Sequence, residues 1–288
     1  MELLKSLYKI YAPTGIEWPM IKFIKDYVAG NVPEAIFRLD TWGNIYITKG
    51  WSIEGFPTLC CHLDQAQKTH SEDFTVIEID GILTGYSPSR NASEGIGADD
   101  KNGIWVCLKA LEQCECLKVF MSVGEEKGCW GSNRANLTFF KDSLYILEPD
   151  CKGGEEIRTL LREVKVASKE FEEALETEKF GYVITEGKTT DILPLTLSGV
   201  GVSCANVPCG YHNPHKDDEY CVIEEIDKCL DFIIHTIGHL RSKFPHMFKT
   251  ETQKWVSNLK KIKKKKEYFL WKSRDKNWIE IFLNVIII

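Results

Sequence analysis

The sequence predicts an α/β fold with a mostly parallel, doubly wound sheet and helices on both faces. Helical and strand patterns alternate along the chain. The segment PTLCCHL at 57–63 is a continuous apolar run, which is typical of a strand covered on both faces. Acidic and histidine residues follow several predicted strands directly, and ligand sites of open α/β sheets gather at that carboxyl edge.

Hydrophobic spacing predicts the individual elements. Ile21, Ile24 and Val28 recur every three or four residues, as on one face of an amphipathic helix. Gly81 separates two β-prone runs and predicts a hairpin turn. Asp100 opens an apolar-periodic segment, where acidic residues suit the positive end of a helix dipole. In chain order we expect a helix at 16–28, strands at 44–48 and 57–63, a hairpin at 74–80 and 82–86, a helix at 100–116, strands at 117–123, 143–147 and 199–206, and a helix at 223–240.

Size and charge limit the possible functions. A chain of 288 residues with 43% hydrophobic residues can bury the core of one large α/β domain. We predict a single catalytic domain over 1–245, a short polar helix within 151–182, and an extension over 246–288. The net charge of −6 argues against nucleic acid and anionic membranes as partners of the bulk of the protein, so small molecules or peptides are expected.

Cysteine usage predicts a cytoplasmic protein. The eleven cysteines include no CxxC pair, and the start of the sequence lacks a signal-peptide pattern, so we expect reduced thiols. Cys60 and Cys61 adjoin His62, but cysteine is among the most buried residue types, which favours a packing role over metal ligation.

The predicted extension combines a lysine run at 260–266 with an apolar end at 278–288. The apolar end is shorter than the roughly 20 residues that span a bilayer, so we expect no integral membrane segment. Three alternatives remain: a tail that packs on the core, a partner-binding segment, or a peripheral anchor.

Five clusters of acidic and histidine residues carry the chemistry. Carboxylates and neutral imidazoles are the ligands that a pair of divalent cations requires in a hydrolase. Each cluster has an ordinary alternative, such as a helix cap or a solvated acidic pair, but their conjunction predicts a metallohydrolase. The clusters are His62 with Asp64, Asp99 with Asp100, Glu125 with Glu126, Glu148 with Asp150, and His215.

The spacing within two clusters suggests separate roles. His62 and Asp64 lie on the same side of a strand end, so Asp64 can orient the imidazole. The adjacent Glu125 and Glu126 repel each other and have no evident packing use. One can bind metal while the other takes a proton from the attacking water.

The stretches that hold these clusters resemble one family. The chain is similar to the dinuclear zinc exopeptidases and deacylases, which include tripeptidase T, glutamate carboxypeptidase, succinyl-diaminopimelate desuccinylase and acetylornithine deacetylase. The resemblance covers about residues 1–240, and the order of its motifs is specific. The matching stretches are CHLDQ at 61–65, GIGADDKNGI at 95–104, SVGEEKGCWGS at 122–132, YILEPD at 145–150 and NPHKDDEY at 213–220.

The resemblance implies two Zn²⁺ ions, with Co²⁺ or Mn²⁺ as alternatives, and metal-assisted hydrolysis of an amide bond. His212 is a rival of His215, and Asp150 is a weaker rival of Glu148. The implied roles are His62 as ligand of one metal, Asp99 as bridge, Glu126 and Glu148 as terminal ligands, His215 as ligand of the second metal, Asp64 as the residue that orients His62, and Glu125 as general base.

One departure from the family concerns the lid domain. Many members insert a lid or dimerisation domain after the ligand at the position of Glu148, whereas here only 151–182 is available. The resemblance then leaves the oligomeric state and the source of oxyanion stabilisation open. Tyr211 and His212 are candidate oxyanion donors, as a tyrosine is in related single-domain aminopeptidases.

Three hypotheses of function remain. The first is an exopeptidase that cleaves the peptide C–N bond of short peptides, the second an amidohydrolase of N-acyl amino acids, and the third an inactive peptidase-like binding protein. Glu148 favours deacylase or carboxypeptidase chemistry, because the family's aminopeptidases more often have aspartate there. The ADDK and NPHKDDEY stretches favour the tripeptidase. The third hypothesis is weakened because every expected ligand and the base are present.

Overall fold

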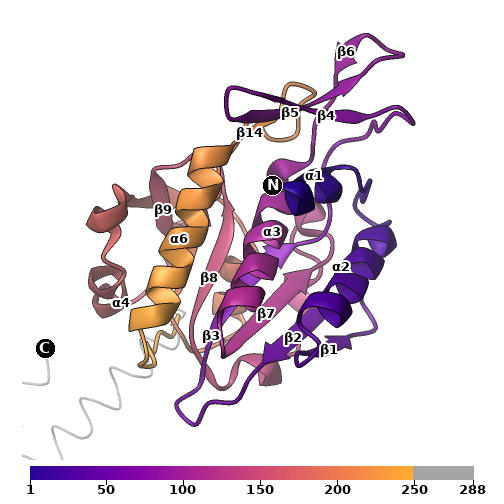
Figure 1. Ribbon diagram of the computed structural model, residues 1–288. Coiled ribbons are helices and arrows are strands. Elements are labelled where there is room, and N and C mark those ends of the chain that lie inside the picture. Colours follow the sequence, from indigo (N-terminus) through magenta and orange to yellow (C-terminus); the bar gives the residue numbers. More distant parts are fainter. Residues whose placement is uncertain (249–288) are drawn as a thin grey trace, which may run out of the picture. The chain divides into compact units, whose positions relative to one another are not determined.

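A nine-stranded sheet forms the centre of the computed structural model, which describes residues 1–248 (Figure 1). The four middle strands β7, β3, β8 and β12 run parallel to one another, and antiparallel pairings extend the sheet on both sides. The predicted α/β fold with a mostly parallel sheet is therefore confirmed. In spatial order the strands are β1 (Ile36–Leu39), β2 (Ile45–Lys49), β7 (Leu117–Ser122), β3 (Phe56–His62), β8 (Ser143–Cys151), β12 (Cys204–Pro208), β9 (Glu156–Leu161) and β10 (Val164–Lys165), with β11 (Val183–Gly187) paired to β9.

Helices cover both faces of this sheet. Figure 1 shows α1, α2, α3 and α6 on one face, where α3 contacts β3 and β8 and α6 contacts β12. The other face packs against α5 and short 3₁₀ helices, with Phe120 and Phe140 between them. The helices are α1 (Glu2–Tyr8), α2 (Trp18–Asn31), α3 (Ala98–Gln113), α4 (Lys169–Ala174), α5 (Ile192–Leu197) and α6 (Ile223–His239), and the 3₁₀ turns are η1 (Glu125–Lys127), η2 (Ser132–Arg134), η3 (Leu137–Phe140) and η4 (Thr177–Phe180).

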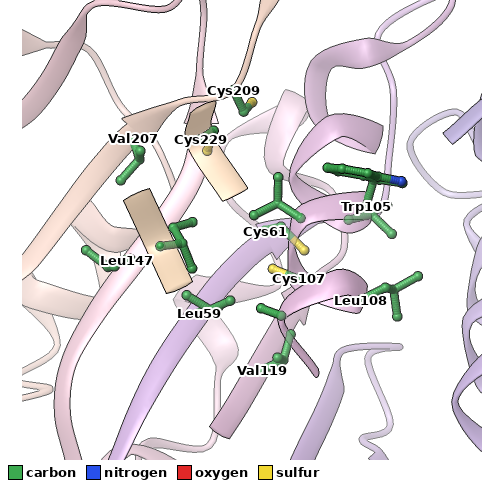
Figure 2. Close-up of a cluster of buried hydrophobic side chains, with 14 of the residues drawn as sticks. Leu59, Cys61, Trp105, Cys107, Leu108, Val119, Leu147, Val207, Cys209 and Cys229 are labelled. Carbon is green, nitrogen blue, oxygen red and sulfur yellow. The ribbon is translucent and has the colours of Figure 1, made fainter. Parts of the chain in front are cut away.

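The larger core lies between α3, α6 and the parallel strands. Figure 2 shows Leu59 and Cys61 of β3 facing Cys107 of α3, with Val119 of β7 and Leu147 of β8 beside them. All five side chains are buried. The apolar side chains of neighbouring strands thus form one continuous surface on which the helix packs. This packing holds the carboxyl ends of the strands rigidly at one edge.

A smaller five-stranded sheet joins two distant parts of the chain. Its strands are antiparallel where they pair, and β14 pairs with β5 so that Tyr220 lies opposite Thr84. This pairing places the loop that carries His215 beside the segment that leads to Asp99. The strands are β4 (Thr75–Ile79), β5 (Ile82–Ser87), β6 (Ala92–Ser93), β13 (Tyr211–His212) and β14 (Tyr220–Val222).

Some predicted boundaries were wrong. The strand expected at 199–206 begins only at Cys204 and ends at Pro208. The strand expected to end at 147 continues to Cys151, so Glu148 lies inside β8 and Asp150 near its end. The segment 151–182 is not one polar helix, because β9 joins the main sheet next to β12. In β9 the residues Ile157, Thr159 and Leu161 are buried in strict alternation, which is the two-residue period of a strand.

No helix within residues 1–248 has the length and apolar character needed to cross a membrane. Residues 249–288, which hold the lysine run and the apolar end of the predicted extension, lie outside the described part of the chain.

Candidate metal centre

Three parallel strands deliver functional residues to the same edge of the sheet. His62 is the last residue of β3, Asp150 lies near the end of β8, and Glu125 follows β7 after two residues. Because these strands run in the same direction, their carboxyl ends meet. The shared direction of these strands therefore brings together residues that are far apart in the sequence.

Asp99 lies at the centre of the arrangement. Its Oδ1 is 3.0 Å from Nε2 of His62, and its Oδ2 is 3.1 Å from Nε2 of His215. The same nitrogen of His215 lies 3.1 Å from Oε1 of Glu126, and Nε2 of His62 lies 3.7 Å from Oδ1 of Asp150. One carboxylate thus faces two histidines, and a further carboxylate stands beside each histidine.

The neighbouring Asp100 has a structural role. Its Oδ2 accepts the backbone N–H of His62 at 3.1 Å, and its Oδ1 accepts that of Gly103 at 3.0 Å, as a helix cap does. A Cβ at Gly103 would lie 2.3 Å from both Asp100 Oδ1 and the Pro149 carbonyl oxygen. Glycine therefore permits α3 to approach β8 closely and sets the position of Asp99.

Asp64 positions other residues rather than touching the centre of the cluster. Nδ1 of His62 lies 2.9 Å from the Asp64 carbonyl oxygen and 3.4 Å from Oδ1 of its carboxylate. The carboxylate also accepts the backbone N–H groups of Glu125 and Glu126 at 3.0 and 3.3 Å and the hydroxyl of Thr14 at 2.7 Å. Asp64 therefore holds both the imidazole and the acidic turn, which supports the predicted orienting role.

Glu219 is a supporting residue for which the sequence indicated no role. Its fully buried carboxylate accepts the backbone N–H groups of Gly97 and Asp99 at 2.6 and 3.2 Å and the side-chain amide of Gln67 at 2.8 Å. These bonds fix the loop that presents Asp99. The only sequence signal was the position of Glu219 four residues after His215.

The carboxyl of Glu219 should make the stability of the metal-free protein dependent on pH. Burial, assisted by the charge of Asp99, raises its pKa from 4.5 to about 8. The folded state then holds a proton that the unfolded state releases above pH 4.5, so the free energy of unfolding falls as pH rises from 4.5 to 8. One proton contributes up to about 1.4 kcal/mol per pH unit. Urea unfolding of Glu219→Gln across this window should show a weaker pH dependence than the wild type, and equal slopes would contradict the assignment.

The charges of the cluster fit divalent cations. Burial would lower the pKa of His62, but Asp150, Asp64 and Asp99 raise it well above its usual range. Hydrogen bonds to Asp99 and Glu126 raise the pKa of His215 to about 10. Oε1 of Glu126 is buried, and apart from its contact with His215 it has no hydrogen-bond partner. Several buried carboxylates surround the imidazole nitrogens, and together they are ligands that suit Zn²⁺, Co²⁺ or Mn²⁺.

Glu125 is set apart from the other carboxylates. Burial, together with the charges of Asp191 and Asp99, raises its pKa to about 8 against the opposing effect of His62. The thiol of Cys129 donates to its Oε1 at 3.4 Å. A carboxyl group with a pKa near neutrality can both accept and return a proton.

Glu148, the predicted terminal ligand, makes its own contacts on a different side of these residues. Glu148 is fully buried, accepts the hydroxyl of Thr190, and groups with Cys60 and Asp191 rather than with His62. Asp150, by contrast, groups with His62 and Asp100, with ligand atoms within 4.8 Å of one another. Of the two residues, Asp150 is therefore the one with a carboxylate oxygen close to Nε2 of His62.

The two candidate oxyanion donors have different surroundings. The hydroxyl of the buried Tyr211 donates to Oδ1 of Asp150 at 3.3 Å and so borders the cluster. Nε2 of His212 lies 2.7 Å from Oε2 of Glu225 on α6, and its ring stacks on Tyr220. Only Tyr211 therefore contacts a residue of the cluster.

Comparison with known proteins identifies the fold. No family model and no curated protein matches this chain. Among solved structures, aminopeptidase PepT of Bacillus cereus aligns with a TM-score of 0.68 at 14% identity, over 81% of this chain and 96% of that one. A tripeptidase of Staphylococcus aureus gives 0.66 at 12% identity over 83% and 97% of the two chains. This chain has the fold of these peptidases.

A third similar structure comes from an archaeon. An aminopeptidase of Desulfurococcus kamchatkensis has 18% identity and a TM-score of 0.63, with 83% of this chain and 94% of that one covered. The aminopeptidase fold is thus shared at low sequence identity. In the chain described here, this fold holds Asp99 between His62 and His215.

Proposed function

We propose that this protein is a dinuclear metal-dependent hydrolase, an exopeptidase that cleaves the peptide C–N bond of short peptides. The observation that carries the proposal is the position of Asp99, whose two oxygens face two different histidines at 3.0 and 3.1 Å. A bridging carboxylate between two sets of ligands is the arrangement that two-metal hydrolases require. The shared aminopeptidase fold supports the choice of a peptide substrate.

The residues divide into two sets around Asp99. His62 and Asp150 would hold one cation with Asp99, and Glu126 and His215 would hold the other. We propose Zn²⁺ for both, with Co²⁺ or Mn²⁺ as alternatives. When bound, the pair supplies Lewis acidity that activates water and polarises the substrate carbonyl.

Glu125 moves the proton in this proposal. Its carboxylate accepts a proton from the attacking water and then returns it to the leaving amine, so that one residue serves both halves of the hydrolysis. Asp64 keeps Glu125 in place through the backbone N–H bond at 3.0 Å. The burial that raises the pKa of Glu125 to about 8 makes both transfers accessible near neutral pH.

An aspartate in the terminal ligand position favours aminopeptidase chemistry. A glutamate there would favour a deacylase or carboxypeptidase, but the geometry favours Asp150 over Glu148. The structural neighbours, an aminopeptidase and a tripeptidase, point the same way. N-acyl amino acid hydrolysis remains the alternative that the assay must separate.

A cleavage assay read by mass spectrometry tests this function. Zinc-loaded protein is incubated with free di- and tripeptides and with their N-acylated counterparts, and Glu125→Gln serves as control. Loss of the N-terminal residue from free peptides only, absent in the control, is the expected result. Cleavage confined to acylated substrates would establish a deacylase instead, and no cleavage of either set would favour the inactive binding protein.

Tyr211 is the proposed oxyanion donor, and its replacement should slow turnover. Removing one such donor costs on the order of 100-fold in kcat, so Tyr211→Phe should lower kcat far more than it changes KM. His212→Ala should stay close to wild type, because His212 contacts Glu225 rather than the cluster. Steady-state kinetics on a cleaved peptide measure both, and an unchanged rate in both variants would remove the two residues from this role.

A further inference from the structure

A second cluster of histidines and a carboxylate lies near the C-terminal end of α6. Nε2 of His235 is 2.8 Å from Oε2 of Glu176, and Nε2 of His239 is 3.7 Å from the same oxygen. The three ligand atoms lie within 4.8 Å of one another. Each of the three side chains is about one third exposed, so an ion from solvent can reach them.

The spacing of these atoms suits a zinc ion. His235 and His239 are four residues apart on a helix, so both imidazoles lie on the same face. Zinc bonds of 2.0–2.1 Å in tetrahedral geometry place neighbouring ligand atoms about 3.3 Å apart. The distances from Glu176 to the two histidines, 2.8 and 3.7 Å, bracket this value.

Both ring nitrogens of His239 face backbone carbonyl oxygens. Its Nδ1 lies 2.8 Å from the His235 carbonyl oxygen, and its Nε2 lies 3.0 Å from the Ala174 carbonyl oxygen. A neutral imidazole carries only one N–H and can donate to only one of these oxygens. If Nδ1 donates, the lone pair of Nε2 faces the Ala174 oxygen at the C-terminal end of α4, where the helix dipole favours a cation.

Glu176 is held in a conformation that turns it toward α6. Its φ of +51° lies in the left-handed region, which is uncommon for residues other than glycine. Lys179 also contacts Oε2 of Glu176, at 2.7 Å. Lys179 is 59% exposed and can swing into solvent, so it competes with a metal ion but does not block the site.

We propose that Glu176, His235 and His239 form a separate site for one Zn²⁺ ion, with water or the Ala174 carbonyl as fourth ligand. The ion would fasten Glu176 and the end of α4 to α6; α4 and α6 lie side by side in Figure 1. The site is distinct from the candidate metal centre. His235 follows Glu225, the partner of His212, by ten residues of α6, or about 15 Å along the helix.

Equilibrium dialysis against ZnCl₂, with bound zinc measured by mass spectrometry, tests the site. Wild-type protein should hold one more equivalent of zinc than His239→Ala or His235→Ala. The zinc affinity of this site should be lower in each variant than in the wild type by more than about tenfold. His246→Ala is the matched control, because His246 is an exposed histidine outside the cluster, with Nε2 2.7 Å from the Lys165 carbonyl oxygen. Equal zinc content in the wild type and the two cluster variants would overturn the proposal.

Three further measurements test this site and its separation from the candidate metal centre. In Asp99→Asn, where the proposed active-site metals are weakened, the additional change His239→Ala should still remove one equivalent of zinc. Lys179→Ala should bind this zinc more tightly than wild type, since the competing ammonium is gone. Zinc should also raise the Tm of the wild type more than that of His239→Ala. If Lys179→Ala left the zinc affinity unchanged and zinc raised both Tm values equally, the site would be ruled out.

Discussion

Glu125→Gln is expected to abolish nearly all peptide hydrolysis while the protein keeps its full content of active-site metal. Glutamine preserves the shape of the side chain but cannot accept the proton of the attacking water. General-base catalysis contributes about 10²- to 10⁴-fold, so kcat should fall by at least the lower figure. Peptide kinetics and metal analysis of the same preparation measure both quantities.

The matched control for Glu125→Gln is Glu126→Gln. The two residues are adjacent, and Asp64 accepts the backbone N–H of each. Only Glu126 contacts His215, at 3.1 Å, so its replacement should release metal as well as activity. Wild-type rates in Glu125→Gln would show that another group acts as the base.

Asp150→Asn should weaken metal binding strongly, whereas Glu148→Gln should leave it nearly unchanged. Asp150 stands 3.7 Å from Nε2 of His62, and its replacement removes a charged ligand. Glu148 is buried against Thr190 and groups with Cys60 and Asp191. Glutamine keeps the shape of this buried side chain and can still accept the hydroxyl of Thr190.

The comparison is made by zinc titration of both variants, with circular dichroism to establish that each is folded. Loss of a carboxylate ligand should lower the affinity by more than the roughly 10- to 100-fold that supporting residues contribute. Activity should fall in parallel in Asp150→Asn only. The reverse pattern would restore Glu148 as the ligand.

The central sheet and its helices were predictable because their own residues show a clear hydrophobic pattern. The apolar run of β3 and the periodic helices α3 and α6 are long and locally unambiguous. The end of β8 was missed because the strand continues through Glu148 and Asp150, which are polar and yet buried. A hydrophobic pattern cannot reveal a strand whose last residues are buried carboxylates.

The strand β9 illustrates a different limit. Its buried positions alternate with Arg158 and other less buried residues, and the surrounding segment is rich in charge, so a helix was the simpler interpretation. β9 joins the sheet through the pairing of Arg158 with Asn206, a contact that spans nearly 50 residues. Such pairing depends on tertiary structure and leaves little trace in the local sequence.

The candidate site was predicted mainly through motifs. His62, Asp99, Glu126 and His215 were expected as ligands, and the structure brings their side chains together, although their binding of metal is still a proposal. The role of Glu219 could not be predicted, since it consists of hydrogen bonds to the backbone of a loop more than 100 residues away.

The order of the strands has a consequence for when the proposed metal positions form during folding. The parallel neighbours β7, β3, β8 and β12 are not consecutive in the chain, and the ligand set runs from His62 to His215. Parallel pairing between distant segments is slow, because the entropy of closing long loops is lost before the stabilising strand contacts form. A nascent chain that ends before His215 lacks a ligand of the second proposed position, so only a chain that extends past His215 could fill both positions.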